Sequence, residues 1–125
     1  MPTVGDTASR TRRVRAEDIE LFTELTGDRN PLHYDEQAAE RSRFGRIIVQ
    51  GGVTSGLLNA VVAEDLPGPG SVFLHVDWSF KAPVAPGDGV AVPSAKGGFF
   101  FSSSAEAALT AKRRAIVVRS IDLME

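Results

Sequence analysis

The sequence contains no cysteine, only two histidines and no long apolar run. The lack of cysteine excludes disulfide scaffolds, thiolate nucleophiles and iron–sulfur clusters, and two histidines without ligand-like spacing predict no metal site. No segment approaches the ~20 apolar residues of a membrane-spanning helix, and the polar start of the chain has no signal-peptide core, so we expect a cytoplasmic protein without membrane contact. The 14 basic and 16 acidic residues give a net charge of −2, which predicts no nucleic-acid binding.

What is present is typical of a globular protein. Of the 125 residues, 42% are hydrophobic and 24% are charged, which is an ordinary balance for one folded domain. We therefore interpret residues 1–125 as a single domain in which residues 1–9 form a flexible lead-in. Its chemistry must come from carboxylates, the two histidines, hydroxyls, amides or backbone groups.

The pattern of apolar residues predicts helices in the first half of the chain and strands in the second. Apolar spacing of three and four residues predicts helices over 16–26 and 53–66, and Asp35 is placed to cap a short helix that ends near Arg41. Strands are expected over 11–14, 72–81, 89–95, 99–109 and 115–123. This order predicts an α+β fold in which one mostly buried helix packs against a curved antiparallel meander.

The segment 26–33 (TGDRNPLH) concentrates an acid, an amide and an imidazole on one loop. Pro31 prevents the preceding helix from continuing, and Asn30 is suited to hydrogen bonds that fix a turn. A carboxylate at Asp28 and an imidazole at His33 form a natural general acid/base pair near neutral pH. A purely structural role explains the same residues equally well: Asp28 would cap the loop and His33 would pack against the rest of the protein.

A longer pattern resembles the MaoC-like (R)-specific enoyl-CoA hydratases. The resemblance covers about two-thirds of the chain and rests on 22–33 (FTELTGDRNPLH), 43–51 (RFGRIIVQG), the Pro-Gly-x-Gly turn and 80–88 (FKAPVAPGD). That family has the hot-dog fold, in which a long helix is wrapped by an antiparallel sheet. This sequence departs from the family at Gln50, where histidine is usual, and throughout the segment after Asp88.

The resemblance implies a lyase that interconverts trans-2-enoyl and (R)-3-hydroxyacyl thioesters of coenzyme A or acyl carrier protein. Asp28 and His33 are then the catalytic residues that activate water, Asn30 orients their loop, and the Gly51 amide stabilises the thioester oxyanion. No cofactor is implied beyond the coenzyme A of the substrate, and a homodimer is expected. Which of the two catalytic groups acts as the base stays open.

Arginines and other polar residues are further candidates for the site. Arg43 and Arg46, with Arg41 nearby, are candidates for the phosphates of coenzyme A, and a solvated surface explains them equally well. Same-face polar residues at His75 and Asp77 predict an exposed or interfacial strand more strongly than catalysis. Thr54 and Ser55 are interpreted as capping or packing groups rather than nucleophiles.

Two other functions remain as alternatives. A hot-dog thioesterase would hydrolyse the thioester with similar groups, and a non-catalytic subunit would only bind an acyl thioester. The intact segment 28–33 favours hydration over both.

Overall fold

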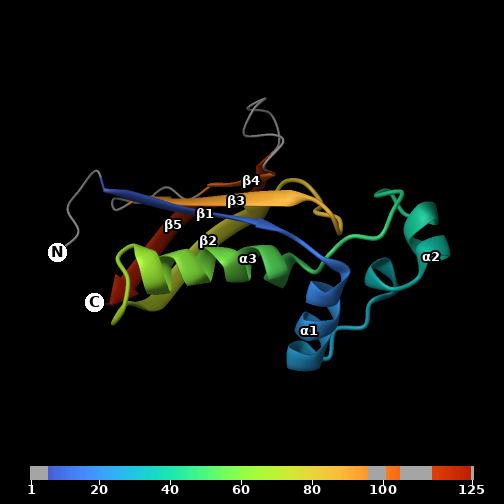
Figure 1. Cartoon of the computed structure of the whole chain (residues 1–125), viewed down its shortest axis with the longest axis horizontal. Coiled ribbons are helices and arrows are strands. Elements are labelled where there is room, and N and C mark those ends of the chain that lie inside the picture. The colour runs from blue at the N-terminus through green and yellow to red at the C-terminus, as the bar shows by residue number, and fades with distance from the viewer. Residues whose placement is uncertain (1–5, 96–100, 105–113, 125) are drawn as a thin grey trace.

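A computed structural model describes residues 6–95, 101–104 and 114–124 of the chain (Figure 1). The helical elements are α1 (Ala16–Thr26), a 3₁₀ turn η1 (Pro31–His33), α2 (Glu36–Arg41), α3 (Gly51–Ala60) and its π-helical continuation η2 (Val61–Asp65). The strands are β1 (Thr7–Arg13), β2 (Val72–Phe80), β3 (Gly89–Ala95), β4 (Phe101–Ser104) and β5 (Arg114–Met124). These strands form one antiparallel sheet in the order β1-β3-β4-β5-β2.

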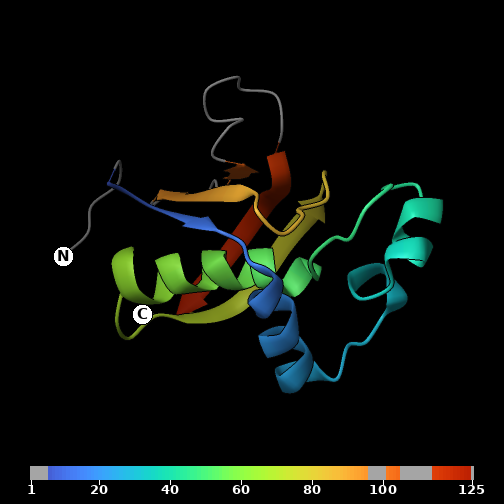
Figure 2. The ribbon, with the colours of Figure 1, turned by 45° about the vertical axis from the view of Figure 1, so that its right-hand side comes forward.

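The core lies between α3 and the sheet. Leu58, Val61 and Val62 are buried on one side of α3 and η2, and they pack with valines from four other segments, Val14, Val49, Val84 and Val90. Gly56 and Asn59 are exposed on the other side of α3, so the expectation of a mostly buried helix holds for one face only. Figure 2 shows α3 running along the sheet while α1 and α2 lie beyond its end. The arrangement confirms the predicted hot-dog fold.

Helix α1 has the predicted bounds because both ends are capped. The backbone N–H of Arg15 donates to Asp18 Oδ2 at 2.8 Å, and guanidinium groups of Arg12 and Arg15 contact Asp18 Oδ1, which is how this buried carboxylate is satisfied. At the other end Gly27 adopts a φ of 78° and donates its N–H to Thr23 O at 2.7 Å. Glycine tolerates this left-handed conformation, so the helix stops there.

Strand β1 begins earlier than expected. Residues 7–9 pair with β3, with Thr7 opposite Ala95, so the prediction of a flexible lead-in over 1–9 is wrong for these residues. Backbone pairing to the edge of β3 satisfies the polar groups of a segment whose own side chains carry little apolar signal. A bidentate pair between Arg10 and Asp65 ties β1 to η2, and the hydrogen bond from this guanidinium lowers the pKa of Asp65. Residues 1–5 lie outside the described residues.

The sheet is not the simple meander that the sequence predicts. Strand β2 pairs with β5, and β3 pairs with β1 and β4. The strand predicted over 99–109 is described only as β4, since 99–100 and 105–109 lie outside the described residues, whereas β3 has the predicted bounds and β5 differs by one residue at each end. Pairing order depends on contacts between distant segments, which local periodicity does not encode.

Helix α3 begins at Gly51, two residues before the predicted start, and aromatic rings lie close to the two glycines of its first turn. A Cβ atom on Gly52 would lie 2.2 Å from Phe22 Cζ, and one on Gly51 would lie 2.8 Å from Phe80 Cε1. Such distances are well inside van der Waals contact. The two glycines therefore bring α1 and β2 against the helix N-terminus.

A pair of glycine substitutions in α3 tests this close approach. We expect Gly52→Ala to lower the free energy of unfolding by about 1–3 kcal/mol, because Phe22 must move. Gly56→Ala is the matched control: nothing lies within 4 Å of its Cβ position, and alanine should raise stability by roughly 0.5–1 kcal/mol through helix propensity. Urea denaturation followed by circular dichroism measures both, and equal stabilisation by the two substitutions would contradict the packing of α1 on α3.

Candidate active site

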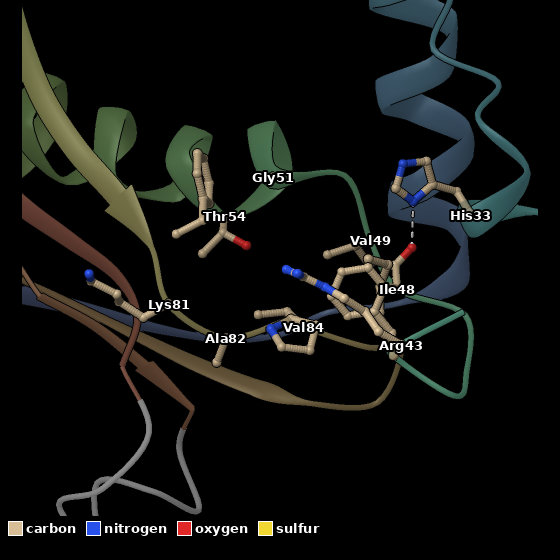
Figure 3. Close-up of a pocket in the computed structure, with 12 residues that line it drawn as sticks. His33, Arg43, Ile48, Val49, Gly51, Thr54, Lys81, Ala82 and Val84 are labelled. Atoms are coloured by element: carbon tan, nitrogen blue, oxygen red, sulfur yellow. Dashed lines mark hydrogen bonds between the residues drawn. The ribbon is translucent and has the colours of Figure 1, made fainter. Parts of the chain in front are cut away.

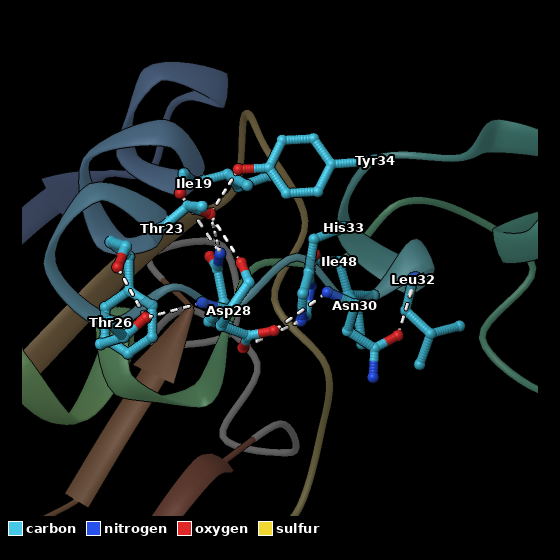
Figure 4. A network of polar contacts seen from close by, with 11 residues as sticks. Ile19, Thr23, Thr26, Asp28, Asn30, Leu32, His33, Tyr34 and Ile48 are labelled. Atoms are coloured by element: carbon cyan, nitrogen blue, oxygen red, sulfur yellow. Dashed lines mark hydrogen bonds and ion pairs between the residues drawn. The ribbon is translucent and has the colours of Figure 1, made fainter.

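The segment between α1 and η1 is held in a curl by its own side chains (Figure 4). The N–H of Asp28 donates to Thr26 Oγ1 at 3.2 Å, that of Asn30 to Asp28 Oδ1 at 3.0 Å, and that of Leu32 to Asn30 Oδ1 at 3.1 Å. These successive side-chain acceptors replace the hydrogen bonds that Pro31 denies to a continuing helix. Asn30 thus caps the 3₁₀ turn that carries His33.

His33 is oriented by a backbone carbonyl from the connection that leads to α3. Its Nδ1 lies 2.7 Å from Ile48 O, and because a carbonyl only accepts, Nδ1 carries the proton. The other ring nitrogen, Nε2, lies 3.7 Å from Asp28 Oδ2. The His33 side chain is 9% exposed and that of Asp28 is 37% exposed, so the imidazole is nearly enclosed while the carboxylate is partly open to solvent.

This geometry leaves two acceptors facing one another. In the neutral imidazole Nε2 has a lone pair, and an ionised Asp28 offers only acceptor oxygens. A separation of 3.7 Å exceeds a direct hydrogen bond but suits a small molecule with two O–H donors between the groups. Groups of these two types, at this separation, are chemically able to bind one water and to exchange a proton with it.

A pocket of about 410 Å³ opens beside the imidazole. Figure 3 shows the Thr54 hydroxyl and the Arg43 side chain pointing into it. Its wall is formed by three parts of the chain: the region of His33, the connection into α3, and the end of β2 with the turn that follows, which together contribute His33, Arg43, Phe44, Ile48, Val49, Gly51, Thr54, Phe80, Lys81, Ala82, Pro83 and Val84. The lining set contains two cationic side chains and no carboxylate.

The predicted site residues divide into those that line this wall and those that lie outside it. His33, Arg43 and Gly51 line the pocket. Asp28 and Asn30 are not in the wall, and Asp28 is next to it through the 3.7 Å approach of its Oδ2 to His33 Nε2. Arg46 also lies outside the wall, with Nη2 3.8 Å from Asp88 Oδ2, because this ion pair directs it toward the turn before β3.

Gly51 is the first residue of α3, and Gln50 is its N-cap. The first N–H groups of a helix have no intrahelical partner and carry a partial positive charge. Since Gly51 lies in the pocket wall, this end of α3 offers backbone donors to a negatively charged oxygen in the pocket.

Sequence reasoning missed the contribution of Thr54. It is 3% exposed, lies in the pocket wall and points its hydroxyl inward (Figure 3). The interval of three residues from Gly51, which places both on one face of the first turn, was the available signal. His75 and Asp77 are exposed on β2 and lie outside this wall.

Within residues 6–95, 101–104 and 114–124, no group of three or more histidine, aspartate or glutamate side chains is placed to hold a metal ion. None of the helices in these ranges is both long and apolar enough to cross a membrane. The polar groups of the pocket wall are the imidazole of His33, the hydroxyl of Thr54, the cationic side chains of Arg43 and Lys81, and backbone groups.

A hot-dog domain with an aspartate–histidine pair beside the N-terminus of its central helix is the class that this fold and site define. The family model of the MaoC like domain matches residues 3–117, and the chain belongs to that family. The solved (R)-hydratase from A. caviae involved in PHA biosynthesis superposes with a TM-score of 0.82 at 27% identity, covering 96% of this chain and 95% of that one.

Curated relatives are similar over about 70% of the chain. A 3-hydroxybutyryl-CoA dehydratase from Methylorubrum extorquens is 44% identical over 89 residues, which is 71% of this chain and 57% of the relative. An (R)-specific enoyl-CoA hydratase from Aeromonas caviae is 39% identical over 87 residues, which is 70% of this chain and 65% of the relative. The matched region thus spans less than two thirds of either relative.

Substitutions of Asn30 test the curl of the loop. Asn30→Ala should lower the free energy of unfolding by about 1 kcal/mol, because the Leu32 N–H loses the acceptor that caps η1. Asn30→Ser keeps a short side-chain oxygen and should cost much less. Thermal and urea unfolding of both variants measure the difference, and equal losses would show that the cap contributes nothing.

Proposed function

We propose that this chain hydrates trans-2-enoyl thioesters and, in reverse, dehydrates (R)-3-hydroxyacyl thioesters. The observation that carries the proposal is the 3.7 Å separation of His33 Nε2 and Asp28 Oδ2 beside a pocket whose wall includes the helix N-terminus at Gly51. Relatives named as a 3-hydroxybutyryl-CoA dehydratase and (R)-specific enoyl-CoA hydratases support it.

The pair would act on one water molecule. A water that donates one hydrogen to Nε2 of His33 and the other to Oδ2 of Asp28 directs its lone pairs away from both groups. Attack on C3 of the enoyl thioester forms the C–O bond as one of the two groups takes a proton, and a proton returned to C2 completes the addition. The role of base is therefore assigned to the Asp28–His33 pair and not to either residue alone.

Negative charge collects on the thioester oxygen as water adds, and it needs fixed donors. The Gly51 amide and the positive end of α3 would supply them, and the absence of a side chain at Gly51 lets the thioester approach closely. Loss of one such donor in other enzymes costs about 10²–10³ in rate. Thr54, whose hydroxyl points into the pocket, is available to orient the acyl group.

Cationic side chains at the pocket suit the phosphate-bearing part of the substrate, whether coenzyme A or acyl carrier protein supplies it. Arg43 and Lys81 line the pocket and fit this role better than Arg46, which is paired with Asp88. Coenzyme A would then be part of the substrate, and the proposed reaction needs no other cofactor because addition of water involves no redox step. A cytoplasmic location stays a prediction from the sequence.

Replacing either catalytic group tests the proposal. Asp28→Asn and His33→Ala should each lower turnover of a short 2-enoyl-CoA by about 10²–10⁴-fold, because each removes one member of the acid/base pair. His75→Ala replaces the other histidine, outside the pocket, and should leave turnover unchanged. Loss of enoyl absorbance is measured together with circular dichroism to confirm that each variant is folded.

A free-thiol assay on the same samples separates the alternatives. Loss of the enoyl absorbance without thiol release supports hydration. Thiol release would instead show a thioesterase, and neither signal, with the thioester bound, would show a non-catalytic subunit. Near-normal turnover in both Asp28→Asn and His33→Ala would overturn the assignment of the site.

We also propose that the protein forms a homodimer through β2. This strand lies at an edge of the sheet and exposes four large apolar residues, with Val72 50%, Leu74 63%, Trp78 37% and Phe80 54% accessible. An apolar edge strand of this kind invites pairing with another strand. Because Phe80 also lines the pocket, a second copy on this face would cover part of the site.

A charged residue on this face should break the dimer. Leu74→Lys is expected to shift the mass measured by light scattering from dimer to monomer, because a lysine on the interface must lose its hydration. Leu25→Lys is the control, since Leu25 is 82% exposed on α1 and away from β2. A monomeric wild type, or equal effects of the two substitutions, would contradict a dimer through β2.

A further inference from the structure

A single buried hydroxyl lies behind the aspartate–histidine pair. Thr23, on α1, is 3% exposed and contacts three different segments through Oγ1. It donates to Asp28 O at 2.7 Å, receives a hydrogen bond from Gln50 Nε2 at 3.2 Å, and is hydrogen-bonded to the Tyr34 hydroxyl. Figure 4 shows Thr23 between Tyr34 and Asp28.

The donors and acceptors around Thr23 Oγ1 determine the direction of each of its hydrogen bonds. The Asp28 carbonyl only accepts, so it takes the one hydrogen of the Thr23 hydroxyl. Tyr34 must therefore donate its own hydrogen to Thr23, and the Gln50 amide fills the second lone pair. The same Nε2 lies 3.2 Å from Ile19 O, which also only accepts, so the amide group cannot be turned round.

Gln50 confirms that this arrangement is constrained. The residue is 2% exposed, and its Oε1 is buried without a hydrogen-bond partner among the described residues. A buried acceptor of this kind is costly, and it remains because both hydrogens of the amide are committed to α1. The amide of Gln50, the N-cap of α3, thus binds Thr23 from the side of that helix. With three hydrogen bonds, the Thr23 hydroxyl has no capacity for another partner.

The two ends of the catalytic loop meet at this hydroxyl. Asp28 is held through its own carbonyl, and Tyr34, which directly follows His33, is held through its phenol. We propose that Thr23 is a positioning residue that sets the separation of Asp28 and His33, an inference that rests on the function proposed above. Thr23 contacts neither the substrate pocket nor the reacting groups, so it acts through the loop alone.

Replacement of Thr23 separates positioning from binding. Thr23→Val keeps the shape and removes the hydroxyl, and it should lower kcat by about 10- to 100-fold, because small misplacement of catalytic groups is costly in rate. KM should change less than about threefold, since the pocket wall is intact and the loss falls on the chemical step. Thr23→Ser restores the hydroxyl and should recover most of kcat.

Amide hydrogen exchange measures local opening of the loop directly and does not depend on enzymatic activity. Thr23→Val should speed exchange of the Asn30 and Leu32 amides by about 3- to 10-fold, as loss of hydrogen bonds favours local opening. The Ala39 amide in α2, bonded to Asp35 O at 2.9 Å, serves as the internal reference. Thr11→Val, the same substitution on the exposed surface of β1, should change neither exchange nor kcat.

Tyr34→Phe gives a second, milder test that does not depend on the folding of Thr23→Val. It removes one hydrogen bond to Thr23 and should lower kcat and speed loop exchange by about 2- to 10-fold. Unchanged exchange of Asn30 in both variants, or a loss that falls on KM, would overturn the inference. An inactive wild type with the expected exchange pattern would instead overturn the proposed function and leave the positioning role supported.

Discussion

The hydrogen bond between His33 Nδ1 and the Ile48 carbonyl is the interaction on which the site depends. It decides which ring nitrogen carries the proton and therefore leaves Nε2 as the acceptor that faces Asp28. It also joins the loop after α1 to the connection that begins α3. One backbone carbonyl thus fixes both the chemistry of the imidazole and its place beside the helix N-terminus.

The fold brings these groups together by stacking three segments at one end of α3. Glycines at Gly51 and Gly52 let Phe80 and Phe22 approach the first turn, so β2 and α1 both reach the pocket region. The backbone N–H of Val49 donates to Val84 O at 2.8 Å and joins the turn after β2 to the same place. The imidazole of His33, the backbone donors of α3 and two cationic side chains consequently share one pocket wall although they come from separate parts of the sequence, and Asp28 lies next to this imidazole.

Local sequence predicted the elements whose ends are set by local chemistry. The bounds of α1 follow from the Asp18 cap and Gly27, and α2 begins after Asp35, whose side chain accepts from the Ala38 N–H. The curl of 28–33 was also readable, because Asn30 and Pro31 act on their immediate neighbours. Local signals failed for the start of β1 and for the strand order, because both depend on pairing between distant segments. Strand β1 pairs with β3, from Arg13 with Gly89 to Thr7 with Ala95, and β2 pairs with β5, from Phe80 with Ile116 to Val72 with Met124.

The sequence alone determined that Asp28 and His33 share a curled loop, that Gly51 lies at the start of a helix, and that the chain resembles one hot-dog family. Only the tertiary structure decided which histidine nitrogen is protonated, that Thr54 faces the pocket while Arg46 turns to Asp88, and that Thr23 joins both ends of the loop. The physical reason is the distance along the chain over which a side chain can act. A side chain caps or bends its own segment through contacts a few residues away, whereas each of these later facts depends on an atom from another segment that only folding brings near.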